Sequence, residues 1–383
     1  MTARRPRVLQ LTGDWKWTGT AEPMLRLALA QRERGFDVEL ACPEPPAGAG
    51  RSLAGEAGAV GLGPALVLSR GQGARWLRDA ADVERVRAAL EARSVDVVHC
   101  WHTRDHVLAL RAARARRRAG RTAVVRSVAS AEPIARRPWS RWLFGPGADA
   151  VLCCSPDAAR RNAALRGGRP IAGLLGAVDL ERFRPAPSDP SVRRALGLAP
   201  EHRVVGIVAR VQRHRRFDLL LEAAARLLTA RPEARLLVVG RGTWRAALAE
   251  RPAARLGIGD RVVFAGYRGF DYPDVLRAID VFTYLVPGSD GSCRALREAA
   301  ACGIPAVTTR RGALPEIVAH GETGLLADET PEALAAAWAT LIGDEARRRA
   351  LGAAARRRAA ACYQPARFAD AVAELYAQAL AGS

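Results

Sequence analysis

Short apolar runs alternate with amphipathic stretches along the first half of the chain. The runs at 8–11 and 38–41 have the length and residue types of buried strands, whereas the stretch at 21–34 repeats its apolar residues at helical spacing. The same pattern predicts strands at 95–98, 123–128 and 150–154, and helices at 75–92, 105–119 and after Ser155-Pro156, a helix-start signature. This alternation predicts a parallel α/β sheet.

A Pro-rich passage at 183–190 interrupts the alternation near the midpoint of the chain. The pattern then restarts, with strands expected at 204–208, 236–239, 262–264, 281–285 and 306–308, helices at 217–230, 244–256 and 293–302, and a mostly helical tail. We therefore expect two doubly wound α/β domains, 1–185 and 186–361, whose strand carboxyl ends face each other across a cleft. A terminal helix at 362–383 is expected to pack back on the first domain.

Composition agrees with two globular domains and adds an unusual charge. The 383 residues are 49% hydrophobic, which is enough for two cores. Lys+Arg number 59 against 39 Asp+Glu, a formal net charge of +20, yet Lys16 is the single lysine. The arginines are dispersed and only 5% of residues are aromatic, so a stacking surface for nucleic acid is not expected. An Arg-driven nucleic-acid binder stays an alternative.

The cysteines and the chain start bear on the cellular compartment. Seven cysteines without a C-x-x-C pair disfavour a disulfide framework and a zinc ribbon, and favour reduced thiols in the cytosol. No stretch approaches the roughly 18 apolar residues of a membrane span. Arg4, Arg5 and Arg7 are similar to the start of a signal peptide, but the apolar run after them is too short. We expect a cytoplasmic protein.

Two acidic residues, Asp290 and Glu298, stand eight positions apart around the start of a predicted helix. Asp290 falls in the loop after a strand and Glu298 about two turns into the helix, so both could face a ligand held at the helix N-terminus. The alternative is a solvated helix charge beside a loop aspartate.

The stretch from Asp290 to Glu298 resembles the E-x7-E signature of the retaining nucleotide-sugar glycosyltransferases with the GT-B fold, glycosyltransferase family 4. Segments at 303–307, 312–316 and 320–326 match, in order, the family's G-x-P-V, G-x-x-E and D-G-x-x-G-x-L-V elements. Asp290 stands where the family has Glu. The resemblance implies that Glu298 contacts ribose and Asp290 the sugar hydroxyls. The donor-binding residues it adds are Gly291, Ser292, Cys293, Arg294 and Ala295.

Arg210 and Arg215 follow the first strand of the second domain. The segment at 204–223 resembles the family's G-R-L-x-x-x-K-G-x-D-x-L-x-x-A block, which implies that both arginines bind pyrophosphate, with Arg215 in place of a lysine. Two fixed cations there would stabilise the departing phosphate as a metal would, so no metal ion or other cofactor is expected. The alternative is that both are solvated surface arginines, the commonest state in an Arg-rich chain.

The loop at 13–22 joins the first strand to the first helix, where backbone N–H groups can meet a phosphate. It resembles the family's glycine loop, with Gly19 and Thr20 in place of a Gly-Gly pair. The resemblance implies that both residues close over the donor phosphates. A glycine in such a turn is also common for steric reasons alone.

His99, His102 and His106 are half of the six histidines and gather at the exit of a predicted strand. Three imidazoles at this spacing could bind zinc. The resemblance implies instead that one histidine touches the donor sugar, with His102 and His106 as candidates. Core packing is the third interpretation, and the sequence leaves open which histidine faces substrate.

The resemblance implies an enzyme that moves a sugar from a nucleotide-diphosphate donor to a hydroxyl acceptor with retention of configuration. A UDP-sugar is favoured over a GDP-sugar, and the products expected are cell-surface polysaccharide, lipopolysaccharide or glycolipid. No specific nucleic acid partner is expected. The alternative is a catalytically inactive nucleotide-sugar-binding protein, because Asp290 and Arg215 depart from the family's residues.

Arginines cluster at 111–118, and arginines are mixed with aromatic residues at 136–144. This pattern fits peripheral contact with an anionic membrane, on the inner face of the plasma membrane, near a lipid-linked acceptor. Solvated helix faces are the other interpretation.

Overall fold

The computed structural model describes residues 4–17, 19–70, 75–115, 121–287 and 291–382, which form two compact units. Unit 1 comprises Met1–Ala177, Ser289–Ser292 and Pro365–Ser383, and unit 2 comprises Val178–Gly288 and Cys293–Gln364. No helix in the described ranges is long and apolar enough to cross a membrane.

The division between the units falls before the Pro-rich passage, not after residue 185 as expected. Val178 N–H donates to the Tyr363 carbonyl at 2.9 Å, and the Phe183 ring meets the Tyr272 ring edge-on at 5.6 Å. The passage therefore packs with unit 2, and the returning terminal segment begins at Pro365 instead of 362.

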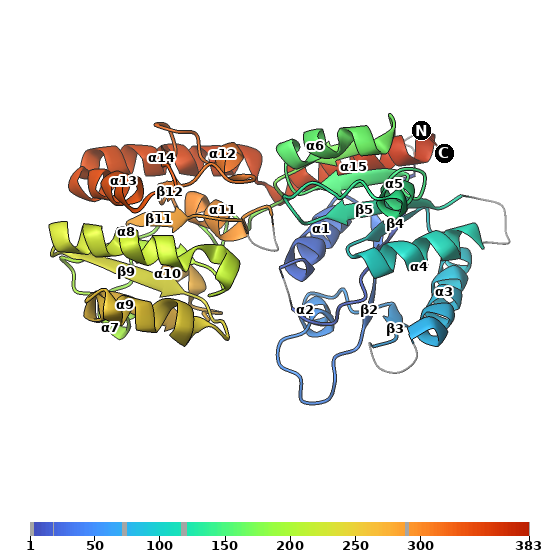
Figure 1. Cartoon of the computed structure of the whole chain (residues 1–383). Helices are drawn as coiled ribbons and strands as arrows, with labels where there is room; N and C mark the ends of the chain where they lie inside the picture. The colour runs from blue at the N-terminus through green and yellow to red at the C-terminus, as the bar shows by residue number, and fades with distance from the viewer. Residues whose placement is uncertain (1–3, 18, 71–74, 116–120, 288–290, 383) are drawn as a thin grey trace. The chain divides into compact units, whose positions relative to one another are not determined.

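Unit 1 is built on a seven-stranded parallel sheet with the order β3-β2-β1-β4-β5-β6-β7. Figure 1 labels β2, β3, β4 and β5 of this sheet. Its strands are β1 (Arg7–Leu11), β2 (Asp37–Pro43), β3 (Leu66–Leu68), β4 (Val97–Cys100), β5 (Ala123–Val128), β6 (Ala150–Cys153) and β7 (Ile171–Gly173). Its helices are α1 (Ala21–Glu33), α2 (Leu53–Ala59), α3 (Arg75–Ala92), α4 (Thr103–Arg114), α5 (Pro138–Phe144), α6 (Pro156–Arg166) and α15 (Pro365–Ala381).

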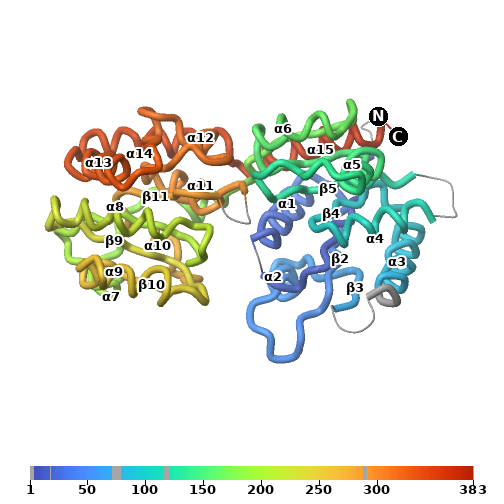
Figure 2. The backbone as a smooth tube through the Cα atoms, viewed as in Figure 1, coloured from blue at the N-terminus to red at the C-terminus, as the bar shows by residue number. Residues whose placement is uncertain are grey.

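Helices cover both faces of this sheet because successive strand residues point to opposite sides. Val8 joins the core formed with α1 and α15, whereas Leu9 joins the core formed with α3 and α4. The terminal helix α15, drawn red in Figure 2, lies among the blue and green elements of unit 1.

Unit 2 repeats the scheme with six parallel strands in the order β10-β9-β8-β11-β12-β13. Its strands are β8 (Arg203–Val208), β9 (Ala234–Val239), β10 (Val262–Gly266), β11 (Val281–Tyr284), β12 (Ala306–Thr308) and β13 (Gly324–Leu326). Its helices are α7 (Pro190–Ala195), α8 (Phe217–Ala230), α9 (Arg251–Arg255), α10 (Tyr272–Arg277), α11 (Arg294–Ala301), α12 (Leu314–Ile317), α13 (Pro331–Gly343) and α14 (Glu345–Cys362). The predicted two parallel α/β sheets are confirmed.

The strand order reverses between β1 and β4 in unit 1, and between β8 and β11 in unit 2. In open parallel sheets such a reversal leaves a crevice at the carboxyl ends of the two strands, where ligands bind. The predicted site residues that the structure describes lie in the loops after these four strands or in the first two turns of the helices that follow.

A buried polar network fastens α15 to the sheet of unit 1. His99 Nδ1 lies 2.7 Å from the Tyr376 hydroxyl oxygen, and its Nε2 lies 2.7 Å from Ser127 Oγ. The His99 ring also stacks on Trp101, with ring centroids 5.0 Å apart. Burial, together with the charge of Arg126, lowers the pKa of His99 to about 3, so the imidazole is neutral at physiological pH.

The free energy of unfolding should fall as the pH drops from about 6.5 toward 3. His99 stays neutral in the folded chain down to about pH 3, whereas the unfolded chain takes up the proton near pH 6.5, so acid favours unfolding. One such histidine contributes up to about 1.4 kcal/mol per pH unit.

Chemical denaturation at several pH values between 4 and 7.5 measures this slope in the wild type and in His99→Gln. The variant should show the shallower slope. Equal slopes would mean that His99 does not titrate as its burial requires.

Candidate functional site

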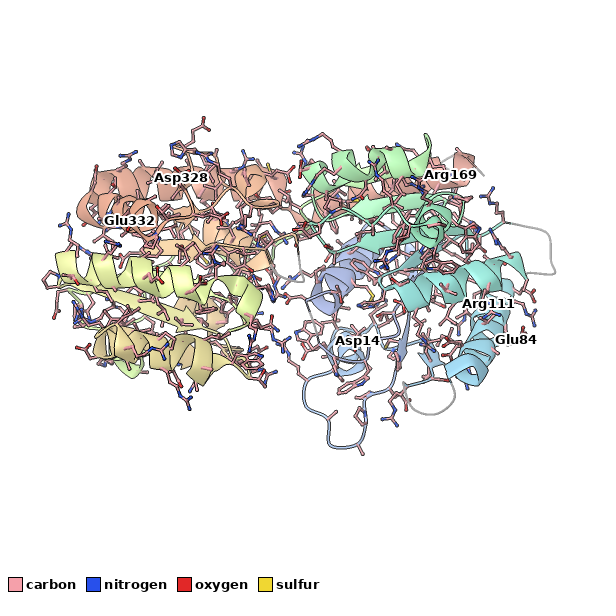
Figure 3. The ribbon with its side chains drawn as sticks, viewed as in Figure 1. Asp14, Glu84, Arg111, Arg169, Asp328 and Glu332 are labelled. Atoms are coloured by element: carbon pink, nitrogen blue, oxygen red, sulfur yellow. The ribbon has the colours of Figure 1, made fainter. Side chains whose placement is uncertain are left out.

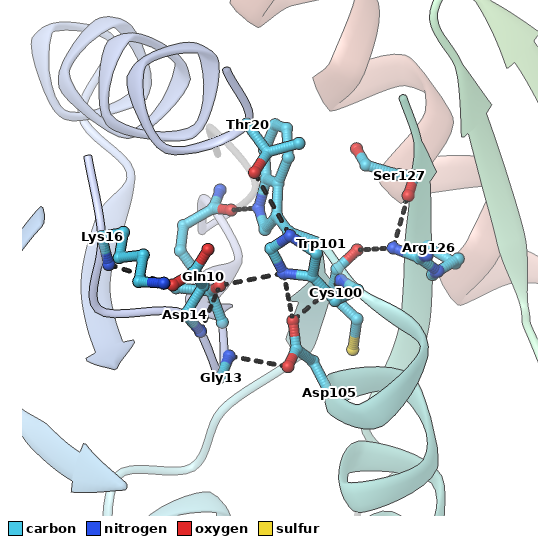
Figure 4. A network of polar contacts seen from close by, with 12 residues as sticks. Gln10, Gly13, Asp14, Lys16, Thr20, Cys100, Trp101, Asp105, Arg126 and Ser127 are labelled. Atoms are coloured by element: carbon cyan, nitrogen blue, oxygen red, sulfur yellow. Dashed lines mark hydrogen bonds and ion pairs between the residues drawn. The ribbon is translucent and has the colours of Figure 1, made fainter. Parts of the chain in front are cut away.

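The loops after β1 and β4 bring His102 together with two threonines, Thr12 and Thr20. Figure 4 labels Thr20, Gly13 and Asp105 in this network of polar contacts. Leu11 and Cys100 are register partners, so the residues that follow them reach the same edge of the sheet. His102 Nδ1 lies 3.1 Å from Thr12 Oγ1, and Nε2 lies 3.2 Å from Thr20 Oγ1. Gly19 and Thr20 stand at the start of α1, where the sequence predicted phosphate contacts.

Asp105 holds this arrangement in place from the first turn of α4. Its carboxylate is fully buried and accepts hydrogen bonds from Gly13 N at 2.7 Å and His102 N at 2.8 Å. The carboxylate also lies 3.2 Å from His102 Nδ1, which orients the ring. A Cβ at Gly13 would stand 2.9 Å from Asp105 Oδ1, so this close approach requires glycine.

The three clustered histidines have different environments, and only His102 is open to solvent, with 37% of its side chain exposed. His106 is fully buried, donates from Nε2 to the Gly147 carbonyl at 2.9 Å and meets Phe144 edge-on. Burial lowers the pKa of His106 to about 4. His106 is therefore a core residue, which corrects its inclusion among the substrate contacts, and His99 is also buried in the core.

Within the described ranges, no group of three or more His, Cys, Asp or Glu side chains is placed to hold a metal ion. The zinc interpretation of the histidine cluster has no support from these residues.

In unit 2, the loop after β8 places Arg215 against the end of β11. Its Nη1 donates to the Tyr284 hydroxyl at 2.8 Å and to the Val286 carbonyl at 2.9 Å, and the guanidinium lies over the Tyr284 ring at 5.3 Å. Its Nε is buried and has no hydrogen-bond partner in the described part of the chain. Arg210 is exposed and forms no ion pair with any described residue.

Glu298 projects from the second turn of α11 and is only 3% exposed. The Tyr272 hydroxyl donates to its carboxylate at 2.9 Å, and Arg294 Nε lies 3.6 Å from Glu298 Oε1. Burial, and then the Glu298 charge, raise the pKa of Tyr272 well above its usual value, so Tyr272 keeps its proton and donates. A solvated helix charge, the alternative reading of Glu298, is therefore wrong.

The residues before α11 are described only in part, since Asp290 lies outside the described residues. Gly291 and Ser292 group with unit 1, and Gly291 N donates to the Ala129 carbonyl at 2.7 Å. Cys293 is buried and precedes α11 with a left-handed φ of 51°. Arg294 and Ala295 form the first turn of α11, a helix that the sequence predicted at 293–302.

Sequence reasoning missed Tyr272 and a set of arginine–aromatic stacks at the carboxyl ends of the unit 2 strands. The guanidinium of Arg213 lies 4.6 Å from the Trp244 ring centroid, and that of Arg241 lies 4.9 Å from the Tyr267 centroid. Trp244 and Tyr267 are 43% and 52% exposed. The sequence offered one indication of these arginine–aromatic pairs, because they lie a few residues after predicted strands.

Two family models together match most of the chain. Residues 17–182 match Glycosyltransferase Family 4, and residues 188–358 match Glycosyl transferases group 1.

Two sequence relatives illustrate the similarity. The lipopolysaccharide core biosynthesis mannosyltransferase LpsB of Rhizobium meliloti is 33% identical over 247 residues, which is 62% of this chain and 68% of that enzyme. The GDP-mannose-dependent alpha-(1-6)-phosphatidylinositol monomannoside mannosyltransferase of Mycolicibacterium smegmatis is 32% identical over 63% of this chain and 66% of that enzyme. Several D-inositol 3-phosphate glycosyltransferases also match, over half of their length or less.

The fold is similar to that of HepE from Anabaena, solved in complex with UDP and glucose. The TM-score is 0.79 at 20% identity, covering 97% of this chain and 99% of HepE. At this identity the likeness shows the fold, which is GT-B.

Replacing Asp105 by Asn should lower the free energy of unfolding by about 1.5–3 kcal/mol, because one charged acceptor serves two backbone N–H groups in a buried position. Chemical denaturation measures the change. Asp328→Asn, at an exposed position on unit 2, is the matched control and should change it by less than about 0.5 kcal/mol. Equal effects of the two substitutions would mean that the Asp105 hydrogen bonds do not hold the loop.

Proposed function

The chain belongs to glycosyltransferase family 4, and we propose that it transfers a sugar from a UDP-sugar to an acceptor hydroxyl with retention of configuration. One observation carries the proposal: Arg215, fixed beside the end of β11, and Glu298, buried on α11, both follow the strands at which the unit 2 sheet reverses order. A cation for phosphate and a carboxylate for ribose at one such edge suit a nucleoside diphosphate.

The leaving nucleoside diphosphate gains negative charge as the glycosidic bond breaks. Tyr284 and Val286 hold the Arg215 guanidinium in one orientation, so it stabilises that charge without reorganising during the reaction. Arg210 supplies a second cation after the same strand. The departing phosphate oxygen takes the acceptor proton on the face from which the donor leaves, so no protein nucleophile is required and positioning dominates catalysis.

The remaining site residues are assigned to the sugar and the phosphates. His102, fixed by Asp105 and partly exposed, contacts the donor sugar or the acceptor. Gly19 and Thr20 contact phosphate, and the N–H groups of 291–295 assist at the start of α11. Asp290, outside the described residues, is assigned to the sugar hydroxyls.

The relatives guide the choice of donor and setting. HepE is solved with UDP and glucose, which favours a UDP-sugar, and the GDP-mannose-dependent mannosyltransferase makes a GDP-sugar the second candidate. Relatives named for lipopolysaccharide core and phosphatidylinositol mannoside synthesis favour a cell-surface polysaccharide, lipopolysaccharide or glycolipid product. A lipid-linked acceptor would place the enzyme in the cytoplasm, peripherally on the inner face of the plasma membrane.

Arg210→Ala and Arg215→Ala should each lower kcat by about 10²–10³, with smaller changes in donor KM. The charge that these guanidiniums meet is larger in the transition state than in the ground state. Steady-state release of UDP or GDP from UDP- and GDP-sugars measures both constants.

Arg251→Ala is the matched control, since Arg251 is exposed on unit 2 and pairs with no described carboxylate. If the two site variants stay folded and keep kcat within about threefold of the control, the pyrophosphate assignment fails. Absence of turnover by the wild type with every donor would favour an inactive binding protein.

Glu298→Gln should weaken UDP or GDP binding by about 10- to 100-fold, because a charge-assisted hydrogen bond to ribose is lost. Calorimetric titration measures the affinity, and thermal unfolding checks that the variant is folded. Tyr272→Phe keeps the carboxylate but removes its internal donor, so it should retain more of the affinity. An unchanged affinity of folded Glu298→Gln would exclude Glu298 from the nucleotide site.

A further inference from the structure

A hollow of about 420 Å³ opens on unit 1 between α5 and α6. Four arginines line it, Arg136, Arg141, Arg166 and Arg169, and its other lining residues are glycine, proline, alanine and leucine. No carboxylate contributes to the described lining. Figure 1 shows α5 and α6 in the same part of unit 1, and Figure 3 labels Arg169 near the end of α6.

Three of these arginines are exposed and carry uncompensated charge. Arg136, Arg141 and Arg169 form no ion pair with any described carboxylate. Other arginines of unit 1 do form such pairs, for example Arg87 with Glu84 at 2.7 Å and Arg104 with Asp82 at 2.6 Å. The hollow is therefore lined by positive charges that no described carboxylate neutralises.

The fourth arginine, Arg166, is fixed and only 2% exposed. Its guanidinium donates to the carbonyls of Phe144, Ala148 and Asp149, among others, which satisfies its N–H groups without a carboxylate partner. Burial lowers its pKa to about 10, and the nearby Arg169 charge adds to this, yet Arg166 stays protonated at neutral pH. Arg166 therefore adds a buried, positively charged group to the lining of the hollow.

The hollow is separate from the edge that carries the reaction residues. Of its lining, residues 145–146 precede β6 and residues 166–169 precede β7, so they lie toward the amino ends of these strands, whereas Arg136 lies in the loop between β5 and α5. His102 and Thr20 lie at the opposite, carboxyl edge. A ligand in the hollow therefore has a role other than that of the reacting sugar.

The outer side of α5 has the residue types of a membrane interface. Trp139 is 55% exposed and stacks on Trp142 with ring centroids 5.0 Å apart. The Arg114 guanidinium lies 5.3 Å from the Trp142 ring centroid. Tryptophan and arginine together favour the headgroup region of an anionic bilayer.

We propose that the hollow between α5 and α6 binds the phosphate group of an anionic phospholipid headgroup, with Trp139 entering the bilayer interface beside it. Guanidinium groups recognise phosphate oxygens in bidentate fashion, and the ligand's charge relieves the mutual repulsion of the four arginines. The proposal names the residues of the membrane contact included in the proposed function, and it does not depend on the reaction catalysed.

The test is co-sedimentation of the full chain with vesicles of phosphatidylglycerol and phosphatidylcholine, compared with vesicles of phosphatidylcholine alone. The site variant is Arg136→Gln/Arg141→Gln/Arg169→Gln, whose three positions are exposed. The matched control is Arg251→Gln/Arg255→Gln/Arg357→Gln, three exposed arginines of unit 2 that remove the same charge. Thermal unfolding and UDP or GDP binding report folding and the donor site independently.

The site variant should lose about 100-fold in affinity for the anionic vesicles, at roughly fivefold for each arginine, while the control stays within about threefold of wild type. Equal losses in the two variants would overturn the proposal, because net charge alone would then explain binding. Titration with glycerol phosphate tests whether the hollow binds the phosphate of a soluble ester instead of that of a lipid headgroup. Loss of glycerol phosphate binding with vesicle binding unchanged would overturn the lipid assignment. Single Arg169→Gln should show a loss of the same sign if the triple variant is unstable.

Discussion

Parallel winding of both sheets is the constraint on which the rest of this structure depends. Every strand of a sheet ends at the same edge, and the order reverses at β1/β4 and at β8/β11. Loops far apart in sequence therefore meet, Thr12 with His102 in unit 1 and Arg215 with Val286 in unit 2. The candidate site residues therefore lie in the loops at the carboxyl ends of the strands, where the backbone is not constrained by the sheet hydrogen bonds.

The sequence predicts the strands and long helices because their apolar residues are strongly periodic, as in α8 and β5. Short elements such as α7 and β13 were not predicted, because a few residues carry no measurable period. The domain boundary was placed too late in the sequence. A Pro-rich passage shows where the pattern of strands and helices changes, but it does not show which of the two cores Phe183 joins.

Local sequence patterns also predicted only part of the candidate site. Motifs indicated Glu298 and Arg215, but their partners Tyr272 and Tyr284 come from separate elements and have no local signature. Spacing could not separate His102 from His106. That distinction depends on tertiary packing. His106 lies in the first turn of α4 and packs against Phe144, whereas His102 lies in the loop before the helix.

Hydrogen–deuterium exchange with saturating UDP or GDP measures whether a nucleoside diphosphate binds at the carboxyl edge of unit 2. Nucleotide binding at this edge should slow exchange in three segments, 210–216, 240–245 and 293–299, and leave exchange in α5 and α6 unchanged. A bound nucleotide that leaves all three segments unchanged, or protects other segments instead, would contradict it.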